Sequence, residues 1–233
     1  HVFVEKPLAI NFTELELVKK AYKTAHELGN GPQLMVGFNR RFSPQVKKIK
    51  SLLDNVKEPK SFIMTMNAGT IPKDHWTQDH NVGGGGIIGE ACHFIDLMRF
   101  LVGREIVSVQ ARRMCDSPGL NITEDKASIT LGFSDGSFGT IFYFANGALS
   151  YPKERVEVFA AGGVLQLDNF RKLKGFGWKG FKKMNLWKQN KGQSGCTAAF
   201  LNGLKEGVPA ISSDEIFEVA RVSIEVSKIL QNQ

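Results

Sequence analysis

The feature that most constrains the fold is a series of strand-like runs, each closed by turn-forming residues. The runs lie at 61–68, 106–115, 126–134, 137–146, 154–160 and 163–168. Polar and apolar residues alternate across 127–133, which is typical of a strand whose sheet is covered on one face. Turn residues at 134–137 and 161–163 predict hairpins. The sequence therefore predicts an α+β fold built on an antiparallel, open-faced sheet.

Helical patterns accompany this sheet. Amphipathic segments lie at 87–101, 194–205 and 213–230, and apolar residues recur in the last one at the spacing of a helix face. Because one face of each strand is polar, we expect these helices to gather on the other face.

The first 45 residues show a different order. An apolar run at 1–9 predicts a buried strand, and either Asn11 or Thr13 can cap a helix that ends near residue 28. A second apolar run at 33–39 precedes Ser43 and Pro44, an N-cap followed by a proline in the first helical turn. This order predicts the tail of a parallel sheet at 1–45, followed by the α+β domain at 46–233.

Several classes of protein are excluded by simple features. The chain has no apolar run long enough for a membrane span, which needs about 18 or more residues. Three widely spaced cysteines form no C-x-x-C pair, which favours the cytoplasm over a disulfide framework or a zinc site. Cys92 precedes His93, but adjacent helical residues point about 100° apart, so we interpret Cys92 as a small buried residue.

A basic segment at 171–191 contributes much of the net charge of +7. Its lysines alternate with aromatic residues, as in some single-strand nucleic-acid binders. A solvated β-ribbon is the interpretation we favour, and an anionic substrate such as a nucleotide sugar is a third explanation. We predict no nucleic-acid partner and no membrane partner.

Two strand ends carry polar groups suited to catalysis or binding. Lys6 follows the first strand, at the edge where open parallel sheets bind ligands. A partly desolvated lysine there can transfer protons, although a surface lysine paired with Glu5 is an equal alternative. Asn39, Arg40 and Arg41 follow the second strand and offer planar donors for a carboxylate, phosphate or sugar.

A glycine run at 83–86 precedes the helix that carries His93. The run permits close approach of a ligand or another strand, and it lacks the lysine of a phosphate loop. Glu90 and Leu97 share a helix face with His93, and Asp96 can orient its ring. A structural histidine and a catalytic one are both open at this point.

The polar loop at 74–80 has aspartates and histidines whose spacing matches no closed metal site, so we predict no metal. A loop lining a ligand pocket, with Trp76 as a platform, fits better.

Taken in order, these motifs resemble the Gfo/Idh/MocA family of oxidoreductases. Glu5-Lys6-Pro7 resembles its E-K-P signature, 37–44 its next strand-to-helix junction, and 84–96 its glycine-rich helix with a histidine and an aspartate. The resemblance covers essentially the whole chain. It implies that 1–45 are the last βα units of a Rossmann domain that binds NAD or NADP, and that the open sheet forms a homo-oligomer.

The resemblance also implies residue roles. Lys6 and His93 correspond to the family's proton-transferring pair. Glu5 and Pro7 would lie beside the nicotinamide ribose, and Lys6 would also contact the cofactor. The remaining candidates are Arg41 for the cofactor and, for the substrate, Asn39, Arg40, Trp76 and Glu90. Many members carry an aspartate four residues before the histidine, where this chain has Gly89, so the usual trio is in question and Glu90 is the neighbouring substitute.

The function expected from the sequence is that of the C-terminal part of an NAD(P)-dependent oxidoreductase. Its substrate would be a sugar, a cyclitol or a nucleotide sugar. No G-x-G-x-x-G motif follows a strand, so we expect these residues alone to be inactive. The alternative is a non-catalytic module that binds a sugar or dimerises.

Overall fold

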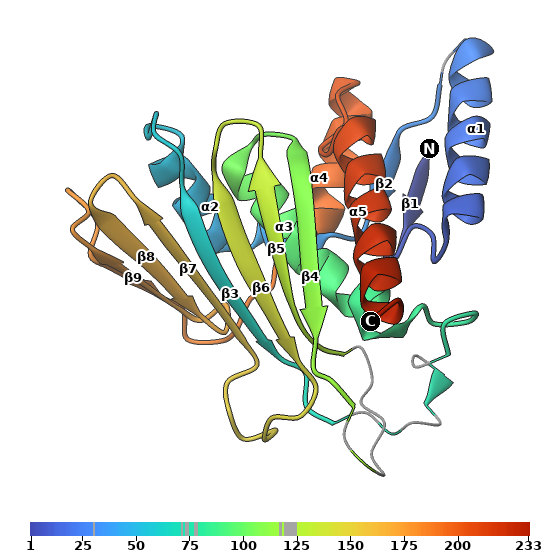
Figure 1. Cartoon of the computed structure of the whole chain (residues 1–233). Helices are drawn as coiled ribbons and strands as arrows, with labels where there is room; N and C mark the ends of the chain where they lie inside the picture. Colours follow the sequence, from blue (N-terminus) through green and yellow to red (C-terminus); the bar gives the residue numbers. More distant parts are fainter. Residues whose placement is uncertain (30, 71, 73–74, 77–78, 117, 119–124) are drawn as a thin grey trace.

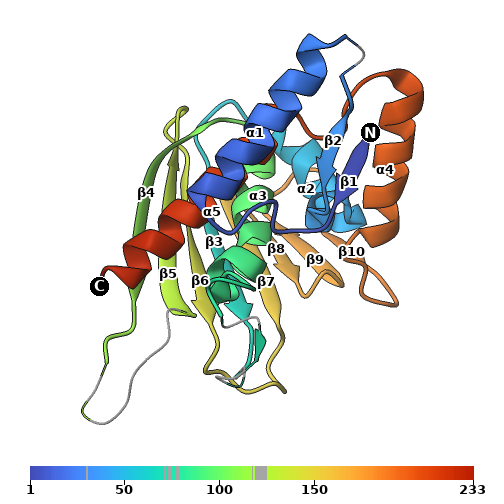
Figure 2. The same ribbon diagram turned by 90° about the vertical axis from the view of Figure 1, so that its right-hand side faces the viewer.

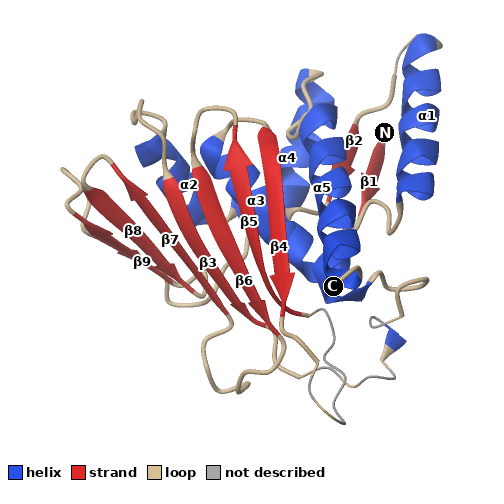
Figure 3. Cartoon of the chain, viewed as in Figure 1, coloured by secondary structure: helices blue, strands red, loops and turns tan. Residues whose placement is uncertain are grey.

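The fold is that of a computed structural model, which describes residues 1–29, 31–70, 72, 75–76, 79–116, 118 and 125–233. It is an α+β arrangement with one large sheet and helices on one side of it (Figures 1 and 3). The large sheet has the strand order β10-β9-β8-β7-β3-β6-β5-β4. Its strands are β3 (Ser61–Asn67), β4 (Ile106–Arg113), β5 (Lys126–Phe133), β6 (Phe138–Phe144), β7 (Glu154–Ala160), β8 (Gly163–Asp168), β9 (Lys172–Phe176) and β10 (Lys183–Asn185).

The predicted hairpins are confirmed, and one pairing is not antiparallel. β5 pairs with β6, and β7 with β8, in antiparallel register. The inner strands β3 and β6, the fifth and sixth in this order, however, run parallel. The prediction of an antiparallel sheet is therefore wrong for this pair. The reason is that β3 is followed by a helix and two further strands before β6 joins its edge, a crossover that no local turn signal reveals.

Helices cover one face of the sheet, as predicted. They are α2 (Pro44–Leu53), α3 (Cys92–Val102), α4 (Gln193–Glu206) and α5 (Ser213–Gln231), and the core lies between them and the strands. The burial of β5 alternates residue by residue, because its inward side chains meet the helices while the outward ones form the open face. No helix in the described part of the chain is long and apolar enough to cross a membrane.

The first strands form a small parallel sheet of their own. β1 (Val2–Val4) pairs with β2 (Leu34–Val36), and α1 (Phe12–Glu27) connects them. Figure 2 shows α1 beside α5 and the β1–β2 pair beside α4. The expected strand–helix–strand order is thus present. Its assignment to a Rossmann domain, and the division into 1–45 and 46–233, stay predictions.

The prediction that the first strand is long and buried is wrong. β1 has three residues, and Val2 and Phe3 are 49% and 37% exposed. β1 has only β2 as a neighbour among the described strands, so one edge and part of its surface are not covered. An apolar run indicates a strand that can be buried, but its burial depends on which other elements pack against it.

The basic segment is the β-ribbon that we favoured. β9 and β10 pair in antiparallel register, and their lysines are exposed. Phe181 is buried, and Trp178 packs against the core cluster. The aromatic residues of this segment are therefore partly structural, which weakens the nucleic-acid interpretation without testing it.

The N-terminal cap of α1 yields a first prediction. Asn11 Oδ1 accepts the Glu14 N–H at 2.9 Å, and Glu14 in turn accepts from the Ile10 N–H at 3.0 Å. Asn11→Ala is expected to lower the free energy of unfolding by about 1 kcal/mol, because it leaves helix N–H groups without an acceptor. Thr13→Ala, at the exposed alternative position, serves as the control in urea unfolding. Equal losses in both variants would contradict the assignment of the cap.

Candidate active site

A cavity of about 340 Å³ lies where the carboxyl end of β1 approaches the glycine-rich turn. It is lined by both predicted catalytic motifs and by the described part of the polar loop. The lining residues are Lys6, Pro7, Ile10, Trp76, Val82, Gly83, Gly85, Gly86, Gly89, Glu90 and Tyr143. The size falls at the small end of ligand pockets, which span about 300–1,000 Å³.

The glycines form one wall of this cavity with backbone atoms. Gly84 and Gly85 have φ of 74° and 75°, in the left-handed region that other residues rarely adopt. A Cβ at Gly86 would lie 3.0 Å from the Tyr143 hydroxyl oxygen. The run is therefore required both by its backbone conformation and by the close approach of β6.

The glycines lead into a π-helical turn, Ile87–Ala91 (η3), before α3 begins. The Cys92 N–H donates to the carbonyl of Ile87, five residues earlier, so this turn is wider than an α-helical one. Single π turns of this kind are frequent at functional sites. The sequence predicted one regular helix from residue 87, and an α-helical pattern does not distinguish a wider first turn.

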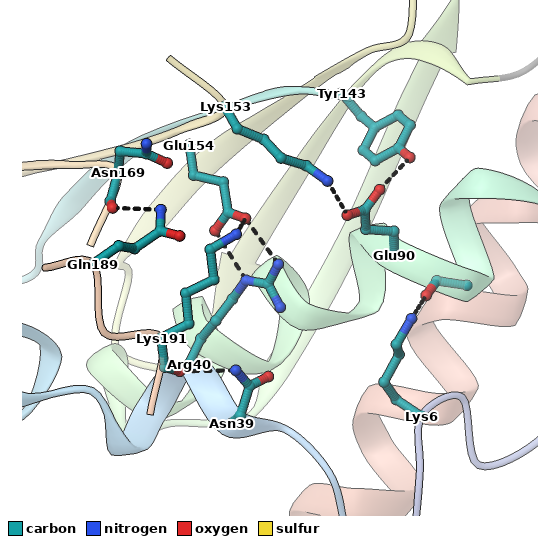
Figure 4. Close-up of polar contacts among 11 residues, drawn as sticks. Lys6, Asn39, Arg40, Glu90, Tyr143, Lys153, Glu154, Asn169, Gln189 and Lys191 are labelled. Carbon is teal, nitrogen blue, oxygen red and sulfur yellow. Dashed lines mark hydrogen bonds and ion pairs between the residues drawn. The ribbon is translucent and has the colours of Figure 1, made fainter. Parts of the chain in front are cut away.

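Lys6 reaches this turn from β1. Its half-buried ammonium group donates a hydrogen bond to the Gly89 carbonyl (Figure 4). Glu5 is exposed, and its carboxylate lies beside Gly37 and outside the cavity lining. Of the two readings of Lys6, a surface pair with Glu5 is therefore not what the structure contains.

Glu90 is fixed by two residues from the sheet. Its carboxylate accepts hydrogen bonds from the Tyr143 hydroxyl at 3.1 Å and from Lys153 Nζ at 2.8 Å (Figure 4). Burial, with Glu90 close by, raises the pKa of Tyr143, so the phenol stays protonated and acts as the donor. Neither Tyr143 nor Lys153 was a candidate from the sequence.

His93 is buried at the start of α3, with its ring edge-on to Phe38. Burial, reinforced by nearby cations of which Arg40 and Lys6 act most, lowers its pKa well below the usual value. The imidazole is therefore neutral at pH 7. Its Nδ1 has no hydrogen-bond partner among the described residues.

The prediction that Asp96 orients His93 is wrong. The Asp96 carboxylate accepts instead from Nε and Nη2 of Arg41, whose Nη1 donates to Glu215 at 2.9 Å. All three side-chain nitrogens of Arg41 are thus engaged, and the residue is 3% exposed. Arg41 thus joins α3 to α5, and its contact with a cofactor stays a prediction.

Arg40 and Asn39 anchor a second network next to Glu90. Arg40 donates from Nε and Nη2 to both oxygens of Glu154, at 3.0 and 2.9 Å, and Lys191 Nζ donates to the same carboxylate at 2.7 Å. Asn39 Nδ2 donates to the Lys191 carbonyl at 2.8 Å. This network therefore joins three segments: the junction after β2, the start of β7 and the segment before α4 (Figure 4).

The other candidates have clear positions. Trp76 is 63% exposed and lines the cavity, as a platform would, while residues 73–74 and 77–78 of its loop lie outside the described residues. Cys92 is buried, and burial raises the pKa of its thiol to about 12, which agrees with an inert core residue. Among the described residues no cluster of His, Cys, Asp and Glu side chains could hold a metal ion.

Comparison with known proteins assigns the chain to a class. The profile of the GFO/IDH/MocA C-terminal domain matches residues 47–166. The uncharacterized oxidoreductase YrbE of Bacillus subtilis is 30% identical over 176 residues, which are 73% of this chain and 49% of that protein. Myo-inositol 2-dehydrogenase of Thermotoga maritima is 29% identical over 176 residues, 73% of this chain and 50% of its own length. The chain belongs to the GFO/IDH/MocA family.

Solved structures share the fold over the whole chain. Levoglucosan dehydrogenase, solved in complex with NADH and levoglucosan, has a TM-score of 0.80 at 22% identity and covers 100% of this chain and 72% of its own. A probable dehydrogenase from Thermotoga maritima has a TM-score of 0.74 at 24% identity, with coverage of 100% and 72%. This chain spans about half the length of the curated relatives that it matches.

Proposed function

We propose that the chain is part of an NAD(P)-dependent oxidoreductase acting on a sugar, a cyclitol or a nucleotide sugar. The observation that carries this proposal is the meeting of Lys6 with the turn before His93 at a glycine-lined cavity. It lies at the carboxyl end of a parallel strand, where such sheets bind ligands. The relatives of this chain include inositol dehydrogenases.

The residues present fit a nicotinamide group. One wall of the cavity is glycine backbone, and Pro7 and Ile10 add apolar surface, so a flat ring can lie close to the chain. The bound nicotinamide supplies or accepts the hydride. Glu5, Lys6 and Pro7 are the residues we propose to hold its ribose. The choice between NAD and NADP is open.

We assign proton transfer to Lys6 and His93. When a substrate hydroxyl is oxidised, its proton must pass to a basic nitrogen as the carbonyl forms. A neutral imidazole can accept that proton, and Lys6 lies at the cavity wall with its position fixed by the Gly89 carbonyl. Asn39, Arg40, Trp76 and Glu90 are the proposed substrate contacts, with Glu90 held in place by Tyr143 and Lys153.

The test is an assay of the complete protein with NAD⁺ and NADP⁺ against a panel of cyclitols, aldoses and nucleotide sugars. Reduced nicotinamide, followed by its absorbance, is expected with at least one substrate. A folded protein that binds a sugar but reduces neither cofactor would overturn the proposal. That outcome would favour the alternative, a non-catalytic binding or dimerisation module.

We also propose that the open face of the sheet forms a homo-oligomer. Large apolar side chains are exposed on its strands, between 36% and 55% for Ile63, Phe138, Phe144, Phe159 and Phe176. Exposed large apolar side chains on several strands of one face are typical of an interface rather than of a solvated surface. A cytoplasmic setting remains our prediction.

This second proposal predicts the effect of a charge on β3, an inner strand. Ile63→Lys is expected to raise the dimer dissociation constant by about tenfold or more, because like charges would meet across a symmetric interface. The new lysine would lie opposite Glu157 of β7, which preserves the fold. Light scattering coupled to size-exclusion chromatography measures the mass, with Leu28→Lys, at the exposed residue just after α1, as the control. A monomeric parent protein, or an unchanged mass in the variant, would contradict the interface.

A further inference from the structure

The polar groups around Glu90 and Arg40 carry more positive than negative charge. Four cations lie in these networks, and only two carboxylates, Glu90 and Glu154, pair with them. The cations are Lys6, Arg40, Lys153 and Lys191. After burial, the largest influences on the pKa of His93 come from these same four cations, and each of them lowers it. The charges that act on His93 are therefore mainly positive.

Arg40 has hydrogen-bonding capacity left over. Its Nε and Nη2 donate to Glu154, whereas its Nη1 has no partner in the described part of the chain. In Figure 4 this third nitrogen points away from Glu154, toward the space between Arg40, Lys6 and Glu90. The side chain is only 5% exposed. Nη1 is not among the fully buried polar atoms that lack a partner, so it is open to an acceptor from a ligand.

Lys6 and Lys153 are the other cations that border this space. Lys6 donates only to a neutral backbone carbonyl, and it forms no ion pair among the described residues. Lys153 is 42% exposed, so its remaining N–H groups can reach a ligand while it keeps its bond to Glu90. In Figure 4 these three positively charged donors border one space, and Glu90 and Glu154 are the only described carboxylates that bond to any of them.

We infer that the substrate carries a carboxylate, bound by Arg40 Nη1 and Lys153, and is a monosaccharide acid such as a hexuronate. This inference deepens the proposed function and rests on it. The fork of the Arg40 guanidinium that would grip a phosphate is occupied by Glu154, which leaves one nitrogen suited to a smaller monoanion. Arg40 and Lys153 do not line the cavity that we assign to the nicotinamide, but Lys153 bonds to Glu90, which does, so the carboxylate would lie next to that cavity.

The test compares matched pairs of ligands by calorimetry on the complete protein without cofactor. The pairs are D-glucuronate with D-glucose and D-galacturonate with D-galactose, and glucose 6-phosphate provides a phosphate arm. In at least one pair the acid is expected to bind about tenfold or more tightly than the neutral sugar, and more weakly at high salt. Binding of glucose 6-phosphate without binding of either uronate would indicate a phosphate-binding site and would overturn the inference.

A variant tests the residue assignment. Lys153→Gln is expected to reduce the preference for the acid to threefold or less, with its fold checked by thermal unfolding. Lys174→Gln, on the exposed ribbon strand β9, carries the same charge change and should leave the preference intact. An unchanged preference in Lys153→Gln overturns the inference, as does the absence of tighter acid binding in both pairs, undetectable binding included.

The two proposals fail in different ways. Lys6-dependent turnover of neutral sugars, without tighter binding of acids, would leave the oxidoreductase in place and remove the carboxylate site. Tight binding of a uronate by a protein that reduces neither cofactor would support the carboxylate site and remove the oxidoreductase.

Discussion

Lys6→Ala in the complete protein is expected to lower kcat by about a hundred- to ten-thousand-fold, the range that general acid–base catalysis contributes. Lys6 lines the cavity, and its ammonium group is positioned by the Gly89 carbonyl. Alanine removes the group to which we assign the exchange of the substrate proton. Steady-state rates across pH, with the substrate found in the panel, give the measurement.

Two further variants separate proton transfer from positioning. Lys6→Arg can keep a hydrogen bond to Gly89, but a guanidinium does not release its proton in this pH range, so kcat should stay low. Lys19→Ala removes a lysine from the exposed face of α1 and should leave kcat unchanged. Near-normal turnover in Lys6→Ala would remove Lys6 from the mechanism.

Glu154→Gln is expected to lower the free energy of unfolding by about 3–5 kcal/mol. Glu154 is 1% exposed and is the only carboxylate that the structure shows bonded to Arg40 and Lys191. Removing its charge leaves a buried guanidinium without a counter-ion, which costs far more than the loss of a surface pair. Chemical denaturation of the parent protein and the variant at pH 7 gives the difference.

The same variant has a defined pH dependence. Burial alone would raise the pKa of Glu154, but Arg40 and Lys191 outweigh it and lower the pKa below the usual value. The stabilisation is therefore complete above the unfolded pKa of about 4.3 and is lost as pH falls through the lower folded pKa. The difference between the two proteins should shrink in acid. Glu157→Gln, on the open face of the same strand, should cost under about 0.5 kcal/mol at either pH.

Most of the fold was predictable because its signals are local. Alternation in β5, the turns before β6 and β8, and the Ser43-Pro44 start of α2 each depend on a few adjacent residues. The parallel pairing of β3 with β6 was missed because it joins strands about 75 residues apart. The exposure of β1 was missed for a related reason, because the burial of a strand depends on the elements that pack against it.

The candidate site divides along the same line. Lys6, Trp76 and Glu90 could be proposed from a strand end, a polar loop and a glycine-rich helix start, and they share one cavity. Glu154 could not, because its importance comes from its contact with Arg40, 114 residues earlier in the chain. Lys191 could not either, because it joins the site only through its bonds with Glu154 and Asn39. Tyr143 left a weak signal: a tyrosine at an inward position of a strand needs a partner for its hydroxyl group.

The contact between Lys6 and the carbonyl of Gly89 has a consequence for how this protein tolerates change. The acceptor in this hydrogen bond is a backbone carbonyl, which every amino acid provides. A Cβ at position 89 would lie 3.4 Å from its nearest neighbour, the Gly83 carbonyl oxygen, so small residues fit there with little adjustment. In a saturation library, position 89 should therefore accept alanine and serine, while position 6 accepts almost nothing. Small residues could therefore replace Gly89 during evolution without loss of the hydrogen bond that orients Lys6.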